Sequence, residues 1–67
     1  MIGTTGVVVL AIGGGQAMGE VELRMAGGTE RFLALAAEAI GVDETVLVVE
    51  ERPGRVVMVE RWLPMPS

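Results

Sequence analysis

Short runs of β-branched and other apolar residues alternate with glycine-rich breaks along the chain, at the roughly 8- to 12-residue spacing of small all-β domains. The clearest run is EVELRMA at 20–26, in which Val21, Leu23 and Met25 alternate with charged residues. Successive side chains of a strand point to opposite faces, so this run predicts a strand with one buried face. Similar runs predict five strands in all, at 4–12, 20–26, 29–36, 45–51 and 55–62.

The glycine pair at 27–28 separates the second predicted strand from the third. Glycine accepts the positive φ angles of a type I′ turn, so we predict a hairpin with a two-residue loop. This loop predicts three cross-strand pairs: Leu23 with Phe32, Val21 with Ala34, and Arg24 with Arg31. The first two pairs make an apolar inner face, whereas the third brings two like charges together.

Residues 32–40, FLALAAEAI, are compatible with two local structures. Leu33, Ala36, Ala37 and Ile40 form a passable helical stripe, but the segment has no good N-cap and is short for a stable helix. We therefore predict strand to about residue 36, followed by a turn-like segment in which Ile40 plugs the core. The alternative is a short helix within 36–44.

The remaining connections complete an all-β reading of the 67 residues. The first run, at 4–12, is continuously apolar and is predicted to be buried on both faces or to lie under an oligomer contact. Pro53 and Gly54 predict a type II turn between the last two strands. Five short strands with one irregular crossing predict a small five-stranded OB-like barrel over 1–63, with 64–67 as a C-terminal tail.

The composition argues against catalysis and cofactor binding within this chain. There is no Cys, His, Lys or Tyr, so an imidazole base, a thiol nucleophile, a Schiff-base amine and the usual transition-metal ligands are all absent. The sequence predicts no enzyme, no cofactor and no small-molecule substrate. The acidic residues lack the alternating spacing of a calcium loop, so we predict no metal site and interpret them as a solvated surface.

Net charge and aromatic content disfavour nucleic acid as a partner. The formal charge is −4, and the aromatic residues are limited to Phe32 and Trp62. Phosphate binding needs excess positive charge and single-strand binding needs stacking platforms. An OB-type nucleic-acid-binding module therefore remains only an alternative.

The stretch GVVVLAIGGGQAMGEV at 6–21 resembles a nucleotide-binding loop at first sight. The dinucleotide fingerprint starting at Gly13 would need glycine at position 18, where Met18 stands, and a Walker loop would need lysine. The run that follows has the two-residue period of a strand instead of a helix. We interpret GGGQAMG as a turn between the first two strands. The apolar run VVVLAI is six residues long, far short of the roughly 20 that span a bilayer.

Three residues are candidates for protein contact. Leu33 and Leu35 should face away from the Phe32 side of the third strand, where they would form an exposed apolar patch. Trp62 follows the last strand and either folds back over the barrel end or is exposed as a contact anchor.

The order of GTTGVVV, GEVEL, GGTERFLALA, AEAIGVDETVLVVE and GRVVMVE resembles the C-terminal soluble domain of the NfeD family, membrane proteins that accompany stomatin- and flotillin-type proteins. The resemblance implies fold-making roles for Gly6, Gly19, Phe32, Ala34, Ile40, Val46, Val48, Val57 and Val59. It also implies an aqueous, cytoplasmic-side domain whose parent is held in the membrane by upstream helices absent here. The implied role is contact with a stomatin- or flotillin-like partner or self-association; a membrane-independent oligomerisation domain is a further alternative.

Overall fold

A computed structural model of the chain describes residues 1–62. The five strands are β1 (Thr5–Leu10), β2 (Gly19–Met25), β3 (Gly28–Leu35), β4 (Thr45–Arg52) and β5 (Val56–Arg61). Each begins and ends within two residues of its predicted position, and the described part of the chain contains no helix. The tail predicted at 64–67 lies outside the described residues.

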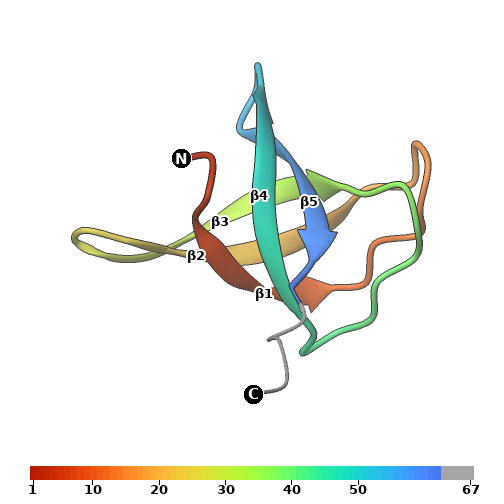
Figure 1. The fold of residues 1–67 in the computed structure, drawn as a ribbon, viewed down its shortest axis with the longest axis horizontal. Helices are drawn as coiled ribbons and strands as arrows, with labels where there is room; N and C mark the ends of the chain where they lie inside the picture. The colour runs from red at the N-terminus through yellow and green to blue at the C-terminus, as the bar shows by residue number, and fades with distance from the viewer. Residues whose placement is uncertain (63–67) are drawn as a thin grey trace.

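The strands close into one barrel in the order β1-β2-β3-β5-β4, with β4 returning to β1 (Figure 1). All pairs are antiparallel except β3 with β5. The β2–β3 and β4–β5 pairs are long, whereas β1–β4 and β3–β5 join over three residue pairs each. The barrel is therefore a β1–β2–β3 sheet and a β4–β5 ribbon closed by two short seams. The expected all-β class and five-stranded barrel are confirmed.

The β2–β3 hairpin projects beyond the barrel and has a different register from the predicted one (Figure 1). Its two-residue loop is Ala26 and Gly27, and Gly28 enters β3 at φ +130°. The observed pairs are Val21 with Phe32, Leu23 with Glu30, Glu22 with Arg31 and Gly19 with Ala34. The slip of two positions keeps the predicted inner face and replaces the Arg24–Arg31 pair by an opposite-charge pair, which explains why this register is favoured.

The first strand is only half buried within the barrel, so of its two predicted alternatives burial on both faces is wrong, and cover by an oligomer contact stays a prediction. Val8 is fully buried, but Val7 and Leu10 are exposed. The register shifts between Val8 and Leu10, so an extra residue is accommodated in β1 opposite β2. Such a bulge bends the strand and lets it serve both the β1–β2–β3 sheet and the seam with β4.

The two long connections lie side by side at one end of the barrel (Figure 1). Residues 11–18 form a small hydrogen-bonded turn, with the Gly13 N–H donating to the Ala17 carbonyl (2.9 Å). Residues 36–44 form turns and bends without helix, and Ile40 pairs with Ile12 through two backbone hydrogen bonds of 2.9 Å. The turn-like interpretation of 36–44 is confirmed, and so is the β-to-β connection through GGGQAMG.

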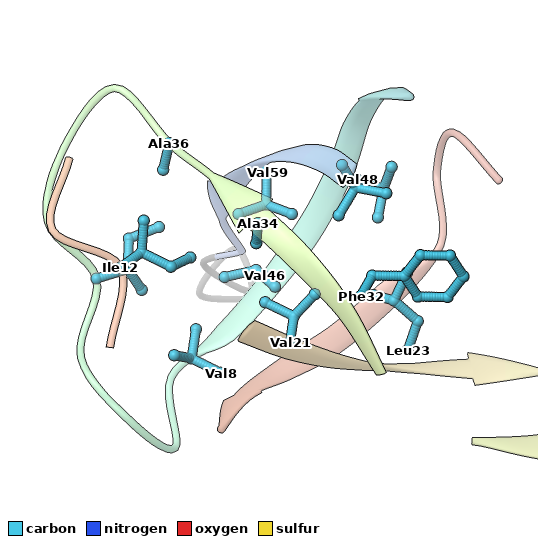
Figure 2. Close-up of a cluster of buried hydrophobic side chains, with 12 residues drawn as sticks. Val8, Ile12, Val21, Leu23, Phe32, Ala34, Ala36, Val46, Val48 and Val59 are labelled. Atoms are coloured by element: carbon cyan, nitrogen blue, oxygen red, sulfur yellow. The ribbon is translucent and has the colours of Figure 1, made fainter. Parts of the chain in front are cut away.

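The core is a single apolar cluster inside the barrel (Figure 2). No polar or charged residue is buried among residues 1–62. The buried apolar residues are Val8, Ile12, Val21, Leu23, Phe32, Ala34, Leu35, Ala36, Ile40, Val46, Val48, Val57 and Val59. Every strand contributes to this set, so the core depends on the whole barrel.

Candidate functional site

The structure separates the two leucines that were predicted to form an exposed patch. Leu33 is 42% exposed on the outside of β3, as predicted. Leu35 is only 7% exposed, so its predicted exposure is wrong. Its cross-strand partner is Met58 of β5, in the short seam that closes the barrel.

Trp62 is held by its backbone at the end of β5. Its N–H donates to the Thr45 carbonyl (2.9 Å), which extends the β4–β5 ladder by one residue. Its side chain is 44% exposed. This exposure agrees with the contact-anchor alternative better than with a ring buried over the barrel end.

Exposed apolar residues gather on the outside of the β1–β2–β3 sheet, a surface we call the outer face and define by Leu10, Met18, Glu20 and Leu33. The register Leu10–Glu20–Leu33 places these three residues in one row across the strands. Their neighbours Val21, Phe32 and Ala34 are buried in the core, so the row points outward. Leu10 is 57% exposed, and Met18, which precedes β2, is also exposed.

Val42 extends the outer face beyond β1. Ile40 bridges Ile12, and the Asp43 N–H donates to the Val8 carbonyl (2.8 Å). These two contacts place the segment that carries the exposed Val42 alongside the part of the chain that contains Leu10. Exposed apolar side chains that gather on one surface, as opposed to scattered singly, are typical of interaction surfaces.

Two carboxylates on the outside of β2 lie near one arginine of β3. The Arg31 guanidinium lies 3.9 Å from the Glu20 carboxylate and 3.8 Å from the Glu22 carboxylate. Both distances are long for a charge-assisted hydrogen bond. Glu20 thus places a carboxylate with only a long contact to Arg31 at the middle of the apolar row.

A hollow of about 410 Å³ lies at the end of the barrel, between the 36–40 segment and the end of β5. Its floor is apolar, with Ile40 and Val59, and its rim is charged, with Glu38, Glu60 and Arg61. Arg61 is already engaged: its Nε donates to Glu44 (2.7 Å) and its Nη2 donates to the Ala39 carbonyl (3.0 Å).

The Glu44 carboxylate ties this end of the barrel together. The hydrogen bond from Arg61 and, second, one from the Gly41 N–H (2.7 Å) hold the pKa of Glu44 below its ordinary value. In turn, the hydrogen bond to Glu44 raises the pKa of Arg61. Both shifts favour the ion pair, and these hydrogen bonds hold the end of β5 against the 39–44 segment.

The arginines of the barrel are mostly matched by carboxylates. Four of the five arginines, Arg31, Arg52, Arg55 and Arg61, lie within 3.9 Å of a carboxylate. Over residues 1–62 no group of three His, Cys, Asp or Glu side chains is arranged to hold a metal ion. In the same range no helix has the length and hydropathy needed to cross a membrane.

Comparison with known protein families assigns this barrel to one of them. The family profile of the NfeD C-terminal domain matches residues 5–60, from the start of β1 almost to the end of β5. The chain belongs to the NfeD C-terminal domain family. The match covers every strand of the barrel, and the resemblance inferred from the sequence is confirmed.

A solved structure supports the same assignment of this NfeD domain. The solution structure of the soluble domain of the NfeD protein YuaF from Bacillus subtilis aligns with a TM-score of 0.77 and 32% sequence identity. The alignment covers 94% of this chain and 75% of that one. No curated protein sequence matches the chain.

The row through Leu10, Glu20 and Leu33 was missed in the sequence because it depends on register across three strands. Leu10 belongs to an apolar run that was expected to be covered, and Glu20 was expected only to point outward. A signal was present: Glu20 alternates with the inward Val21, and Leu33 alternates with the inward Phe32. What the pattern cannot provide is the alignment of one outward residue with another.

Arg55 lies in the turn between β4 and β5, and the Arg52–Glu50 ion pair (2.8 Å) forms at the end of β4. Arg55 instead reaches back to β3, where its guanidinium lies 4.4 Å from the centre of the Phe32 ring. It also donates to the Arg31 carbonyl (3.1 Å), so it covers this end of the core.

Proposed function

We propose that this NfeD domain is a non-catalytic, OB-like protein-interaction module of a membrane-anchored parent protein, and that it assembles with or regulates a stomatin- or flotillin-type partner. The single observation that carries the proposal is the outer face, where Leu10 and Leu33 are exposed in one row on a sheet whose other side is a complete core. A barrel this small gains nothing in stability from leaving large apolar side chains in water, whereas an interface uses them.

Several features agree with a binding role. No polar or charged residue is buried among residues 1–62, whereas Leu10, Met18 and Leu33 are exposed on the outer face. The related YuaF domain was studied as the soluble domain of an NfeD protein. We extend that arrangement to this chain: an aqueous, cytoplasmic-side domain carried by membrane helices elsewhere in the parent.

The direct test is Leu33→Asp, with binding measured against a stomatin-type protein from the same organism and self-association measured by light scattering. A charge at a contact residue should weaken binding by about tenfold or more, which corresponds to ~1.4 kcal/mol. Ile2→Asp is the matched control, because Ile2 is also exposed, gains the same charge and lies outside the outer face.

The result is interpretable only if the fold survives. Leu33 is exposed, so its variant should keep the circular dichroism spectrum and melting temperature of the parent. Leu35→Asp should instead unfold the domain, because that side chain is buried. Unchanged partner binding and self-association in folded Leu33→Asp would refute the outer face as the interaction site.

Two other functional classes are separated by simple observations. A nucleic-acid module would bind labelled single-stranded oligonucleotide strongly at low salt. A membrane-independent oligomerisation domain would self-associate through the same face but would have no hydrophobic helices encoded upstream of Met1.

A further inference from the structure

The outer face has an ordered row of apolar and acidic side chains, which can select one kind of binding partner. Leu10, Glu20 and Leu33 are direct cross-strand neighbours on β1, β2 and β3. Adjacent strands lie about 4.8 Å apart, so Leu10 and Leu33 are separated by about 10 Å with Glu20 midway between them. The row therefore reads apolar, acidic, apolar across the strands.

We infer that this row binds one face of an amphipathic α-helix of the partner, with a Lys or Arg flanked by apolar residues and placed over Glu20. The inference rests on the proposed function and identifies the kind of segment that the outer face would take. In an α-helix, residues i and i+7 lie on one face about 10.5 Å apart, with i+3 or i+4 between them. These spacings match the row.

An extended segment fits the row less well. Side chains on one face of a strand are about 6.7 Å apart at i and i+2 and about 13 Å apart at i and i+4. Neither spacing equals the separation of about 10 Å between Leu10 and Leu33, and only the longer one has a same-face side chain, at i+2, midway between its ends. Addition of a strand by backbone pairing is also disfavoured, because β2 already pairs with β1 and β3 along the row.

The negative charge of Glu20 determines which charge is favoured on the central residue of the bound helix. Glu20 and Glu22 lie 3.9 and 3.8 Å from the Arg31 guanidinium, and Arg24 follows Glu22 on the same face of β2, two residues further from Glu20. The whole chain has a formal charge of −4. A cationic residue over Glu20 gives this carboxylate a closer partner than Arg31 at 3.9 Å, whereas an acidic residue there meets the like charges of Glu20 and Glu22.

The ends of the row allow the helix to continue. Val56 of β5 pairs with Leu33, and the 40–43 segment, which carries Val42, hydrogen-bonds to Val8 and Ile12 on the Leu10 side of the row. Val42 is exposed and Val56 is half-buried. A helix with apolar residues at i and i+7 therefore meets further apolar surface at both ends.

The test uses two synthetic alanine-based helices that have Leu at positions i and i+7 and differ only at i+4, with Lys in one and Glu in the other. Titration into the isotope-labelled chain is followed through the backbone amide signals. We expect the Lys helix to bind about fivefold to tenfold more tightly than the Glu helix at low salt, with the largest shifts at Leu10, Glu20 and Leu33. Salt should reduce the difference between the two helices.

Charge reversal at Glu20 provides the decisive arm. Glu20→Lys should reverse the preference and favour the Glu helix, whereas Glu50→Lys, on an exposed acid of β4 that is also paired with arginine, should leave the preference unchanged. Melting curves check that both variants are folded. Equal binding of the two helices, no binding of either at millimolar peptide, or a preference that survives Glu20→Lys would overturn the inference.

Failure of this inference is distinguishable from failure of the proposed function. If Leu33→Asp abolishes binding of the stomatin-type protein while the two helices bind alike, the outer face is an interaction site for a segment of another shape. If Leu33→Asp changes neither partner binding nor self-association, the interaction role of the outer face itself is wrong.

Discussion

Truncation of Leu23 to alanine measures how much of the stability resides in the barrel core. Leu23 lies in the middle of β2 with 0% of its side chain exposed, packed within the cluster of Figure 2. Leu→Ala removes three carbons, which at about 0.8 kcal/mol per buried methylene amounts to ~2.4 kcal/mol of transfer free energy. The unfilled cavity adds to this, so the expected loss is about 2–5 kcal/mol.

Such a loss is large for a domain of this size. At about 0.05–0.15 kcal/mol per residue, a chain of 67 residues has a free energy of unfolding of roughly 3–10 kcal/mol. Leu23→Ala should thus remove about half of the stability and lower the melting temperature by at least about 10 °C. Urea denaturation followed by circular dichroism measures the change. Leu10→Ala is the control: it truncates the same residue type on the exposed side of β1 and should change stability by no more than about 0.5 kcal/mol. A loss below about 0.5 kcal/mol for Leu23→Ala, or equal losses for the two variants, would refute the assignment of inner and outer faces.

Two further predictions concern the backbone packing and the clasp at the barrel end. Gly19→Ala should destabilise the domain by about 1–3 kcal/mol or prevent folding, because a Cβ there would lie 2.5 Å from the Ala11 carbonyl oxygen. Gly27→Ala is the control: a Cβ at Gly27 meets open space, so this variant should be nearly neutral in the same denaturation assay. Equal melting temperatures for the two variants would contradict the structure. Glu44→Gln should lower the melting temperature near pH 7, because the pKa of Glu44 is lower in the folded state than in the unfolded chain. The ionised carboxylate therefore stabilises the fold at pH values above the ordinary glutamate pKa of about 4.3. This stabilisation is lost as the pH falls through the lower pKa of the folded state. The difference between wild type and Glu44→Gln should accordingly narrow below about pH 4, and a difference that stays constant down to pH 2 would rule out this ion-pair contribution.

The elements of the fold were predictable from local patterns. The period-two alternation of 20–26 predicted β2, and the β-branched runs at 45–51 and 55–62 predicted β4 and β5. Where apolar spacing fitted both helix and strand, in 32–40, the weak capping and short length favoured the correct strand-then-turn interpretation.

The small residues implied by the family resemblance have a physical reason in the structure. A Cβ at Gly6 would meet the Glu22 carbonyl oxygen at 2.5 Å, and one at Gly19 would collide with the carbonyl oxygens of β1 and the residue after it. Both glycines thus allow β1 and β2 to approach closely in a strongly bent barrel. The other implied fold-making positions are all buried: Phe32, Ala34, Ile40, Val46, Val48, Val57 and Val59.

Long-range alignment was harder to predict. The glycine pair at 27–28 fixed the existence of the β2–β3 hairpin but not its register, because Ala26–Gly27 and Gly27–Gly28 are both acceptable two-residue loops. The choice of register depends on cross-strand pairs such as Glu22 with Arg31, and these pairs form only when the two strands come together. Burial of Leu35 has the same origin, since its neighbour Met58 comes from a strand more than twenty residues away.

In the candidate site, too, single residues could be predicted from local sequence patterns, but their alignment across strands could not. Leu33 and Trp62 were found from alternation and position, and both are exposed. Their roles in binding stay predictions. Leu10 and Glu20 could be joined to Leu33 only once the register of β1, β2 and β3 was known.

The central claim is that the outer face of this NfeD domain binds a protein partner. Its most direct test is to map the amide chemical shifts of the isotope-labelled chain on titration with a stomatin-type protein from the same organism. The account predicts that the perturbed signals cluster on the outer face, around Leu10, Glu20 and Leu33, and that Leu33→Asp reduces them at the same partner concentration. Perturbations confined to the hollow around Glu38 and Glu60 at the barrel end, or no perturbation at all, would contradict the account.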